Sequence, residues 1–242
     1  MIIILATIFC DIRSNILFKY LISIILISVI SLLLIAQPDI GQTLLVVFCW
    51  VALIFTSGIN IYILLAIFIA GASLLAYLII FVPKFDYIQG RIFSFFNRET
   101  GTHNFQSDKA IESITSGGFF GKGIGEGVLK NRVPEAHTDY IISVISEEFG
   151  VVAIMLILLL FLILIYMVFK KISFETNDKV KLILIGSISL ILMQATIHVG
   201  VNIRLFPTTG MTLPFLSYGG SSIISTSILA GIILNLTKRK IT

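Results

Sequence analysis

Residues 149–169 read FGVVAIMLILLLFLILIYMVF and contain no charged side chain. A helix needs about 20 consecutive apolar residues to cross the hydrocarbon core of a bilayer, so this stretch alone predicts a membrane span. Four more stretches lack charge, at residues 20–38, 40–83, 182–203 and 205–237. Two of these are longer than one pass requires. The pattern therefore predicts an all-α, polytopic membrane protein.

The composition agrees with this class. Hydrophobic residues make up 57% of the 242 residues and charged residues 12%, whereas a soluble domain has about twice that charged fraction. The net charge of +4 does not indicate nucleic-acid binding, because the basic residues divide between the flanks of the spans and one long loop. Cys10 and Cys49 lie in apolar segments, which favours small core residues over a disulfide or a metal pair.

We expect about six transmembrane helices. Their predicted ranges are Ile16–Gln37, Thr43–Ser57, Ile61–Val82, Tyr140–Phe169, Lys181–Gly200 and Tyr218–Leu236. The apolar run Met1–Cys10 is too short to span, and no basic residue precedes it as in a signal peptide. We interpret it as the end of a span whose beginning is missing.

Basic residues in short loops predict the orientation, because such loops stay in the cytoplasm. They precede the first span and follow the fourth and the sixth: Arg13, Lys19, Lys170, Lys171, Lys179, Lys181, Lys238, Arg239 and Lys240. These segments and the C-terminus are therefore expected in the cytoplasm. The prediction is a single membrane domain, 1–242, with a large extracytoplasmic loop at 83–139.

The long loop carries its own structural signals. Phe105–Thr115 is expected to form a short amphipathic helix lying on the membrane. Residues 116–127 contain six glycines, a density that indicates either a tightly turning backbone or a close approach to a ligand.

The stretch 205–237 is too long for one span. Prolines and glycines interrupt its first half, at Pro207, Gly210, Pro214, Gly219 and Gly220. Non-helical backbone at membrane depth persists only where it is buried in protein or lines a polar cavity. Residues 213–222 are therefore a candidate cavity wall.

Residues 134–139, PEAHTD, place Glu135, His137 and Asp139 at alternate positions directly before a span. Acidic groups at a membrane are costly and are often functional. The competing interpretation makes Asp139 or Thr138 the N-cap of the following helix, with Glu135 and His137 as solvated loop residues. Position alone gives the two interpretations even odds for Asp139.

Polar residues also occur inside the predicted spans. Glu147 and Glu148 either lie at the membrane interface, face a polar cavity or orient residues of the loop. Gln194, His198 and Asn202 recur every four residues and so share one helix face. Hydrogen bonding between helices is the favoured role for this stripe, and lining a cavity is the alternative.

Three separated motifs follow one another along the chain. The first holds the spaced glycines Gly117, Gly118, Gly121 and Gly123. The second runs Pro134-Glu-Ala-His-Thr-Asp139-Tyr140 and continues with Glu147-Glu-Phe-Gly150. The third is Pro207-Thr-Thr-Gly210 with Leu213-Pro-Phe-Leu-Ser-Tyr-Gly-Gly-Ser-Ser222. Together they resemble the SEDS family (shape, elongation, division and sporulation) over nearly the whole chain.

Within that family, residues 106–112 and 208–212 look most like the division-type branch, FtsW, with the elongation branch, RodA, as the near alternative. Family members have about ten spans, so the resemblance implies that the first four are missing here. Asn202-Ile-Arg204-Leu is more charged than the family pattern. The resemblance places the protein in the bacterial inner membrane, at the division septum.

The resemblance implies a peptidoglycan glycosyltransferase that polymerises lipid II and works with a class B penicillin-binding protein and other divisome membrane proteins. It implies that Asp139 matches the family's essential acidic residue, here the expected general base. A lipid-linked precursor transporter is one alternative. An inactive truncated fragment or scaffold of the divisome is the other.

Other residues are expected to contact the substrate or to support the site. The substrate-contacting set is Lys122, Lys130, Arg132, Glu135, His137, Thr138, Ser217, Tyr218, Gly219, Gly220 and Ser221. The supporting set is Pro134, Glu147, Glu148 and Gln194. Arg204 is a further candidate for the pyrophosphate, or else contacts a lipid phosphate or snorkels. A divalent cation, Mg²⁺ or Mn²⁺, bound by the pyrophosphate and a carboxylate, is an alternative to basic residues at the leaving group.

Overall fold

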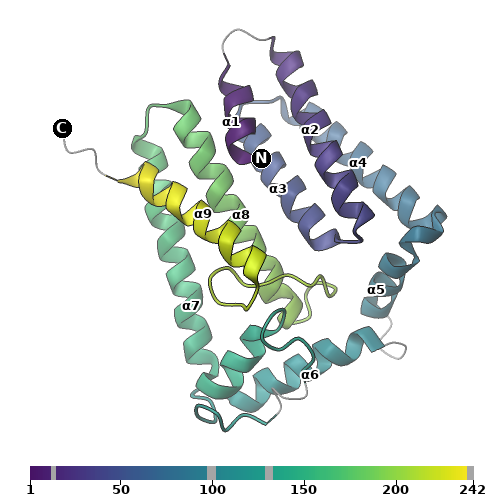
Figure 1. Ribbon diagram of the computed structural model, residues 1–242, viewed down its shortest axis with the longest axis vertical. Coiled ribbons are helices and arrows are strands. Elements are labelled where there is room, and N and C mark those ends of the chain that lie inside the picture. Colours follow the sequence, from purple (N-terminus) through teal and green to yellow (C-terminus); the bar gives the residue numbers. More distant parts are fainter. Residues whose placement is uncertain (12–14, 97–101, 129–132, 239–242) are drawn as a thin grey trace. The chain divides into compact units, whose positions relative to one another are not determined.

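The structure is a computed structural model that describes residues 1–11, 15–96, 102–128 and 133–238 (Figure 1). Every regular element in these residues is helical. The elements are α1 (Ile2–Cys10), α2 (Ile16–Ala36), α3 (Ile40–Thr56), α4 (Ile61–Phe81), η1 (Pro83–Phe85), α5 (Asp86–Phe96), α6 (Thr102–Gly117), α7 (Ile141–Phe174), α8 (Asp178–Asn202) and α9 (Gly220–Thr237).

Five helices in the described part of the chain are long and apolar enough to cross a membrane: α2, α4, α7, α8 and α9. The second expected span, Thr43–Ser57, corresponds to α3, an apolar helix of 17 residues. The prediction of an all-α polytopic membrane protein is therefore confirmed. Polar caps set two of the helix starts, since Asp39 Oδ1 accepts from Gln42 N (2.9 Å) and Asn60 Oδ1 accepts from Tyr62 N (3.0 Å).

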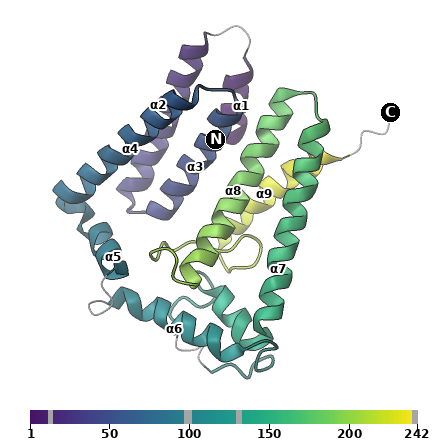
Figure 2. The same ribbon diagram turned by 180° about the vertical axis from the view of Figure 1, so that it is seen from behind.

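The chain divides into two compact units. The first comprises Met1–Asp86, Tyr166–Met193 and Ile228–Thr242, and the second Tyr87–Ile165 and Gln194–Ser227. In the first unit α1, α2 and α3 contact one another, and α3 also contacts α4 (Figure 2). The predicted single membrane domain, 1–242, stays a prediction.

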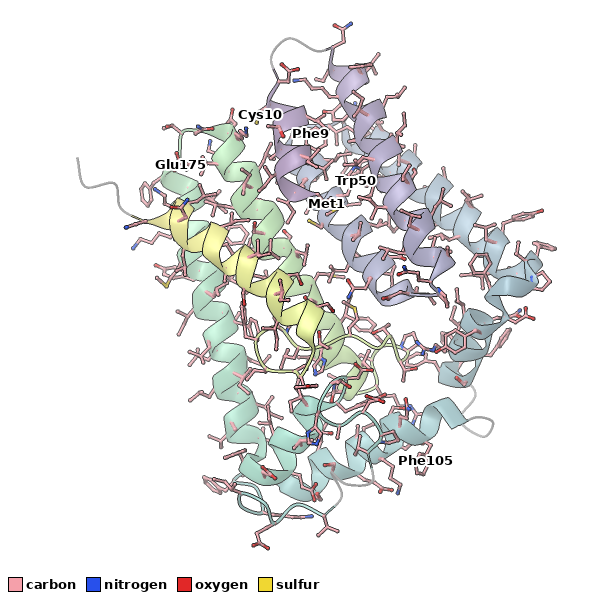
Figure 3. All side chains as sticks on the ribbon, viewed as in Figure 1. Met1, Phe9, Cys10, Trp50, Phe105 and Glu175 are labelled. Atoms are coloured by element: carbon pink, nitrogen blue, oxygen red, sulfur yellow. The ribbon has the colours of Figure 1, made fainter. Side chains whose placement is uncertain are left out.

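A tightly packed apolar core holds the first unit together. Leu5, Leu53 and Ile54 have no exposed surface. Trp50 Nε1 donates to Ser23 Oγ at 3.3 Å, which satisfies a buried indole (Figure 3). Cys49 is buried, Cys10 is partly buried, and both are free thiols.

The second unit contains the long loop and the residues of all three motifs. The expected helix at Phe105–Thr115 is present as α6 and extends at both ends. A further helix, α5, was not predicted. Between α8 and α9 the backbone is non-helical over residues 203–219, as the prolines and glycines indicated.

Candidate functional site

A backbone exchange joins the glycine-rich segment to α7. Gly150 interrupts α7 with φ +77° and ψ −179°. Val151 N and Val152 N therefore donate to Gly118 O (3.0 Å) and Phe119 O (3.3 Å) instead of to carbonyls one turn earlier in α7. The carbonyls that they leave, at residues 147 and 148, accept from Lys122 N (2.9 Å) and Gly123 N (3.0 Å). Four loop–helix hydrogen bonds thus replace two helical ones.

This exchange explains why glycine occupies three positions. A β-carbon on Gly117 would lie 1.9 Å from Ser146 O, one on Gly121 would lie 2.1 Å from Glu148 O, and one on Gly150 would lie 2.2 Å from Phe119 O. Gly121 and Gly150 also have positive φ angles. The structure therefore assigns these glycines to a close approach between the loop and α7.

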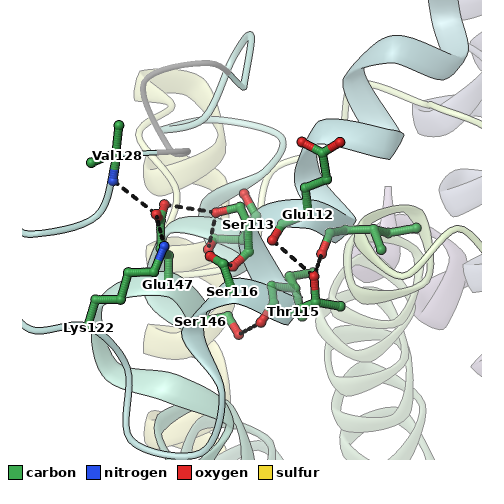
Figure 4. A network of polar contacts seen from close by, with 11 residues as sticks. Glu112, Ser113, Thr115, Ser116, Lys122, Val128, Ser146 and Glu147 are labelled. Atoms are coloured by element: carbon green, nitrogen blue, oxygen red, sulfur yellow. Dashed lines mark hydrogen bonds and ion pairs between the residues drawn. The ribbon is translucent and has the colours of Figure 1, made fainter.

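Glu147 lies at the centre of this packing and has no exposed surface. Its carboxylate accepts from Val128 N (2.9 Å), Lys122 Nζ (3.2 Å) and Ser113 Oγ (3.1 Å) (Figure 4). Ser113 belongs to α6, and the other two donors belong to the glycine-rich loop that follows it. A buried charge is tolerated only when it is paired and hydrogen-bonded, and this one is both. Glu148 Oε1 accepts from Gly125 N (3.3 Å). Both glutamates thus contact the loop and orient it, one of the roles that the sequence left open.

The PEAHTD turn is held through its main chain. Three consecutive carbonyl oxygens accept hydrogen bonds: that of His137 from Tyr218 N (2.9 Å), that of Thr138 from Ser217 Oγ (2.6 Å) and that of Asp139 from Asn202 Nδ2 (3.0 Å). The segment after α8 and the end of α8 therefore fix this turn without engaging the carboxylate of Asp139.

Asp139 does not cap α7. Within the described residues, its carboxylate accepts no hydrogen bond from the first turn of the helix. Thr138 is not the cap either, because its hydroxyl donates to Glu135 O (3.1 Å) and Glu135 Oε2 (3.0 Å). The capping interpretation of both residues is therefore not supported by the geometry.

The electrostatic environment of Asp139 favours its protonated form. The side chain is half-buried. Burial raises the pKa of Asp139 above its ordinary value, the negative charge of Glu135 raises it further, and the positive charge of Arg91 opposes both. Asp139 Oδ2 lies 3.6 Å from where a β-carbon of Gly210 would be. A half-buried carboxylate of raised pKa is the kind of group that general-base catalysis uses.

The polar stripe on α8 binds the segment that follows it. Gln194 Nε2 donates to Thr212 O (2.9 Å) and to Ser222 Oγ (3.1 Å). His198 Nδ1 lies 2.7 Å from Met211 O. Hydrogen bonding between helices, the favoured role, occurs between Gln194 and Ser222 of α9. The contacts with Thr212 and Met211 instead satisfy the non-helical backbone that the prolines and glycines create.

The remaining predicted residues lie at different places in the second unit. Glu135 and His137 are exposed on the turn, and so is Pro134. Ser217 is buried against the turn, while the side chains of Tyr218 and Ser221 are exposed and Gly219 and Gly220 lead into α9. Lys122 is already paired with Glu147 at 3.2 Å. Lys130 and Arg132 lie outside the described residues.

The sequence analysis missed one residue near Asp139. Arg91 of α5 acts electrostatically on Asp139, and its Nη1 donates to Thr208 O at 2.8 Å. Arg91 also lines a cleft together with Arg204. A single arginine in an unassigned segment, 48 residues before Asp139, carries no local signal that could have identified it.

Comparisons with known proteins agree with the motifs. A family model described as "Cell cycle protein", for FtsW, RodA and SpoVE, matches residues 1–241. The probable peptidoglycan glycosyltransferase FtsW of Caulobacter vibrioides is 36% identical over 210 residues, which are 86% of this chain and 52% of the relative. The same-named protein of Enterococcus hirae is 33% identical over 236 residues, 92% of this chain and 59% of the relative.

Solved structures show the same architecture. One, described as the structural coordination of polymerization and crosslinking by a peptidoglycan synthase complex, has a TM-score of 0.75 and 27% identity, over 98% of this chain and 66% of the other. The rod shape determining protein RodA of Thermus thermophilus has a TM-score of 0.63 and 26% identity, over 98% and 62%. This chain spans about half the length of the curated relatives it matches. It belongs to the FtsW/RodA/SpoVE family of cell cycle proteins, the family that its motifs predicted.

Proposed function

We propose that this protein is a peptidoglycan glycosyltransferase that polymerises lipid II during cell division. The names of the FtsW relatives support this function. The observation that carries it is the half-buried carboxylate of Asp139, which makes no capping contact while three hydrogen bonds fix the main-chain carbonyls of its turn. The fold thus holds the backbone of Asp139 and leaves its carboxylate available for a substrate.

In the proposed reaction the acceptor sugar hydroxyl attacks the anomeric carbon of a polyprenyl-pyrophosphate-linked donor. Asp139 takes the hydroxyl proton, the new glycosidic bond forms, and the bond to the pyrophosphate oxygen breaks with inversion. A positioned general base contributes typically about 10²–10⁴-fold. The raised pKa of Asp139 strengthens it as a base, because its basicity moves nearer to the working pH.

The residues around Asp139 are proposed to position the acceptor. Glu135, His137 and Thr138 share its turn, and residues 217–221 follow the segment that binds this turn. Lys122, Lys130 and Arg132 remain proposed cations for the pyrophosphate. The pairing of Lys122 with Glu147 makes a supporting role the simpler one for this lysine.

A divalent cation at the pyrophosphate stays a prediction. The described residues contain no group of three or more His, Cys, Asp or Glu side chains that could hold a metal ion. No protein-only metal site therefore fits them, and no step of the mechanism above passes through a metal. Polymerisation measured with and without a chelator tests this point.

The proposal extends to location and partners. We place the protein in the bacterial inner membrane, at the septum, with residues 83–139 outside and the C-terminus in the cytoplasm. We also propose a class B penicillin-binding protein and other divisome membrane proteins as partners. The similar solved structure described as a peptidoglycan synthase complex supports an assembly of this kind.

The deciding experiment compares lipid II polymerisation by the purified protein and by its Asp139→Asn variant, with a full-length FtsW relative as the positive control. Asparagine has nearly the same shape but cannot act as a base, so we expect polymer from the wild type only. The proposal fails if the relative makes polymer and this protein, with its partner, makes none. Lipid II translocation in liposomes without polymer would favour the transporter. Unchanged function in the variant would favour the scaffold.

A further inference from the structure

A cleft in the second unit contains two arginines. It is a small cleft, partly open to solvent, and is lined by Arg91, Ser94, Ser107, Arg204, Phe206 and Thr208, among others. Arg91 comes from α5 and Arg204 from the non-helical segment after α8, 113 positions apart in the sequence. Two guanidinium groups on one small cleft repel each other unless an anion lies between them. The cleft is therefore built for negative charge.

Each arginine also keeps an unused donor. Arg91 Nη1 donates to Thr208 O (2.8 Å), its Nη2 contacts Tyr87 Oη, and its guanidinium lies 4.4 Å from the centroid of the Tyr87 ring. Arg91 Nε and Arg204 Nη2 are buried and have no hydrogen-bond partner among the described residues. A buried donor without an acceptor costs about 1–3 kcal/mol, so an anion that accepts from both nitrogens would remove two such costs.

One carboxylate already occupies part of this positive region. Arg204 Nη1 forms an ion pair with Asp108 of α6, whose side chain is half exposed while that of Arg204 is 15% exposed. The backbone of Arg204 has φ +58°, an uncommon conformation for a residue with a β-carbon. Such strain concentrates at functional sites. The exposed carboxylate of Asp108 is thus paired with the largely buried guanidinium of Arg204, whose backbone is constrained.

The cleft adjoins the proposed general base. The positive charge of Arg91 acts on the carboxylate of Asp139. The carbonyl that Arg91 holds belongs to Thr208, two residues before Gly210, which lies beside Asp139 Oδ2. An anion in the cleft would therefore be a near neighbour of the reacting centre. In a glycosyl transfer from a pyrophosphate, the anion at that place is the leaving group.

We propose that Arg91 and Arg204 bind the diphosphate of the lipid-linked donor, and that the carboxylate of Asp108 is the counter-ion which this diphosphate displaces from Arg204. The assignment rests on the proposed function. When the anomeric carbon–oxygen bond breaks, its electron pair goes to the diphosphate. The two guanidinium groups stabilise the added negative charge, and Asp139 receives the proton of the acceptor hydroxyl. Fork-shaped guanidinium groups suit this task because they bind phosphate oxygens bidentately.

The test is a binding measurement without turnover. Farnesyl diphosphate, which carries no sugar, is titrated by calorimetry into the purified protein in detergent. Loss of a charge-assisted hydrogen bond predicts that Arg91→Gln and Arg204→Gln each weaken binding roughly 10- to 100-fold. Asp108→Asn removes the competing carboxylate and is expected to tighten binding several-fold. Misfolding cannot produce such a gain, so this variant remains informative if an arginine variant is unstable.

Lys109→Gln is the matched control. Lys109 is the next residue of α6 and pairs with Glu112 at 2.6 Å, so its loss changes the charge of the same helix without touching the cleft. Binding in this variant is expected to equal that of the wild type. Unchanged binding in both arginine variants, or weaker binding in Asp108→Asn, overturns the proposal.

Two more probes distinguish the sources of the anion. Farnesyl monophosphate should bind more weakly than the diphosphate. Inorganic diphosphate should compete with farnesyl diphosphate and lose the same factor in the arginine variants. If inorganic diphosphate bound and farnesyl diphosphate did not, the lipid-linked assignment would be overturned. Because no polymer is formed in these titrations, a negative result here is separate from a negative result with Asp139→Asn.

Discussion

Asp139 and Glu147 lie eight residues apart at the start of one helix and have opposite environments. Glu147 is fully buried and accepts from three donors, one in α6 and two in the loop that follows it. Asp139 is half-buried, and no hydrogen bond reaches its carboxylate from the described residues. A satisfied carboxylate fixes structure, whereas an unsatisfied one is free to react. This difference is why we propose that Asp139 performs the chemistry and that Glu147 supports the fold around it.

The largest effect is expected at the glycines that seat the loop around Glu147. Gly121→Ala would place a β-carbon 2.1 Å from Glu148 O, against backbone and at positive φ. The loop must then shift and break its bonds to α7. We expect a loss of about 2–4 kcal/mol and a clearly lower melting temperature in detergent.

Gly90→Ala provides the control for this substitution. Gly90 lies in α5, and a β-carbon at this position would have no other atom within 4 Å among the described residues. Alanine is the better helix former by about 1 kcal/mol, so this variant should melt at the same temperature or higher. Equal destabilisation of the two variants would contradict the close loop–helix approach.

The next effect concerns Glu147 itself. Glu147→Gln keeps the shape but removes the charge that pairs with Lys122, and it places an amide NH₂ among three donors. We expect a loss of about 1–3 kcal/mol in thermal unfolding. Glu148→Gln, at a more exposed position that accepts from Gly125 N, should cost less. A variant of Glu147 that melts normally yet makes no polymer would instead give Glu147 a direct part in the reaction.

Asp139→Asn should change the thermal stability in the opposite direction, toward a more stable protein. A raised folded-state pKa means that the folded protein favours the protonated carboxyl, and this contribution is lost as the pH rises through that pKa. At neutral pH the ionised carboxylate therefore destabilises the folded state, and asparagine removes this destabilisation. We expect an equal or slightly higher melting temperature at pH 7.5. The gain should vanish as the pH falls toward the unfolded-state pKa of aspartate, about 3.9.

The smallest effect is a shift in the pH dependence of polymerisation. Activity should fall on the acid side as Asp139 becomes protonated. Glu135→Gln removes a negative charge that raises the pKa of Asp139. The acid limb of the pH–activity profile should therefore move to lower pH. Arg91→Gln removes a positive charge that lowers this pKa, so the limb should move to higher pH. Shifts in the same direction would contradict the electrostatic assignment.

Much of this arrangement could be read from the sequence, because local rules determine it. Uninterrupted apolar runs predicted the spans, and the prolines and glycines after α8 predicted non-helical backbone there. The four-residue spacing of Gln194, His198 and Asn202 predicted a shared face with polar contacts. Each of these signals lies within a single segment of the chain.

The remaining features depend on contacts between distant segments. The glycine pattern indicated a tightly turning backbone or a close approach to a ligand, but spacing could not show that the loop approaches the backbone of α7 around Gly150. Lys122 looked like a free cation until its bond to Glu147 was known. The position of Asp139 before a helix fitted a cap equally well, and only the absence of a capping contact from the described residues decided the point.

The exchange at Gly150 has a consequence for how this part of the protein opens. The amides of Lys122, Gly123, Val151 and Val152 all lie in one reciprocal set of bonds. Lifting the loop would leave α7 with two unpaired amides and two unpaired carbonyls next to a bilayer, where such groups cost several kcal/mol each. Loop and helix should therefore open together as one cooperative unit. In hydrogen–deuterium exchange these four amides should lose protection at a common rate.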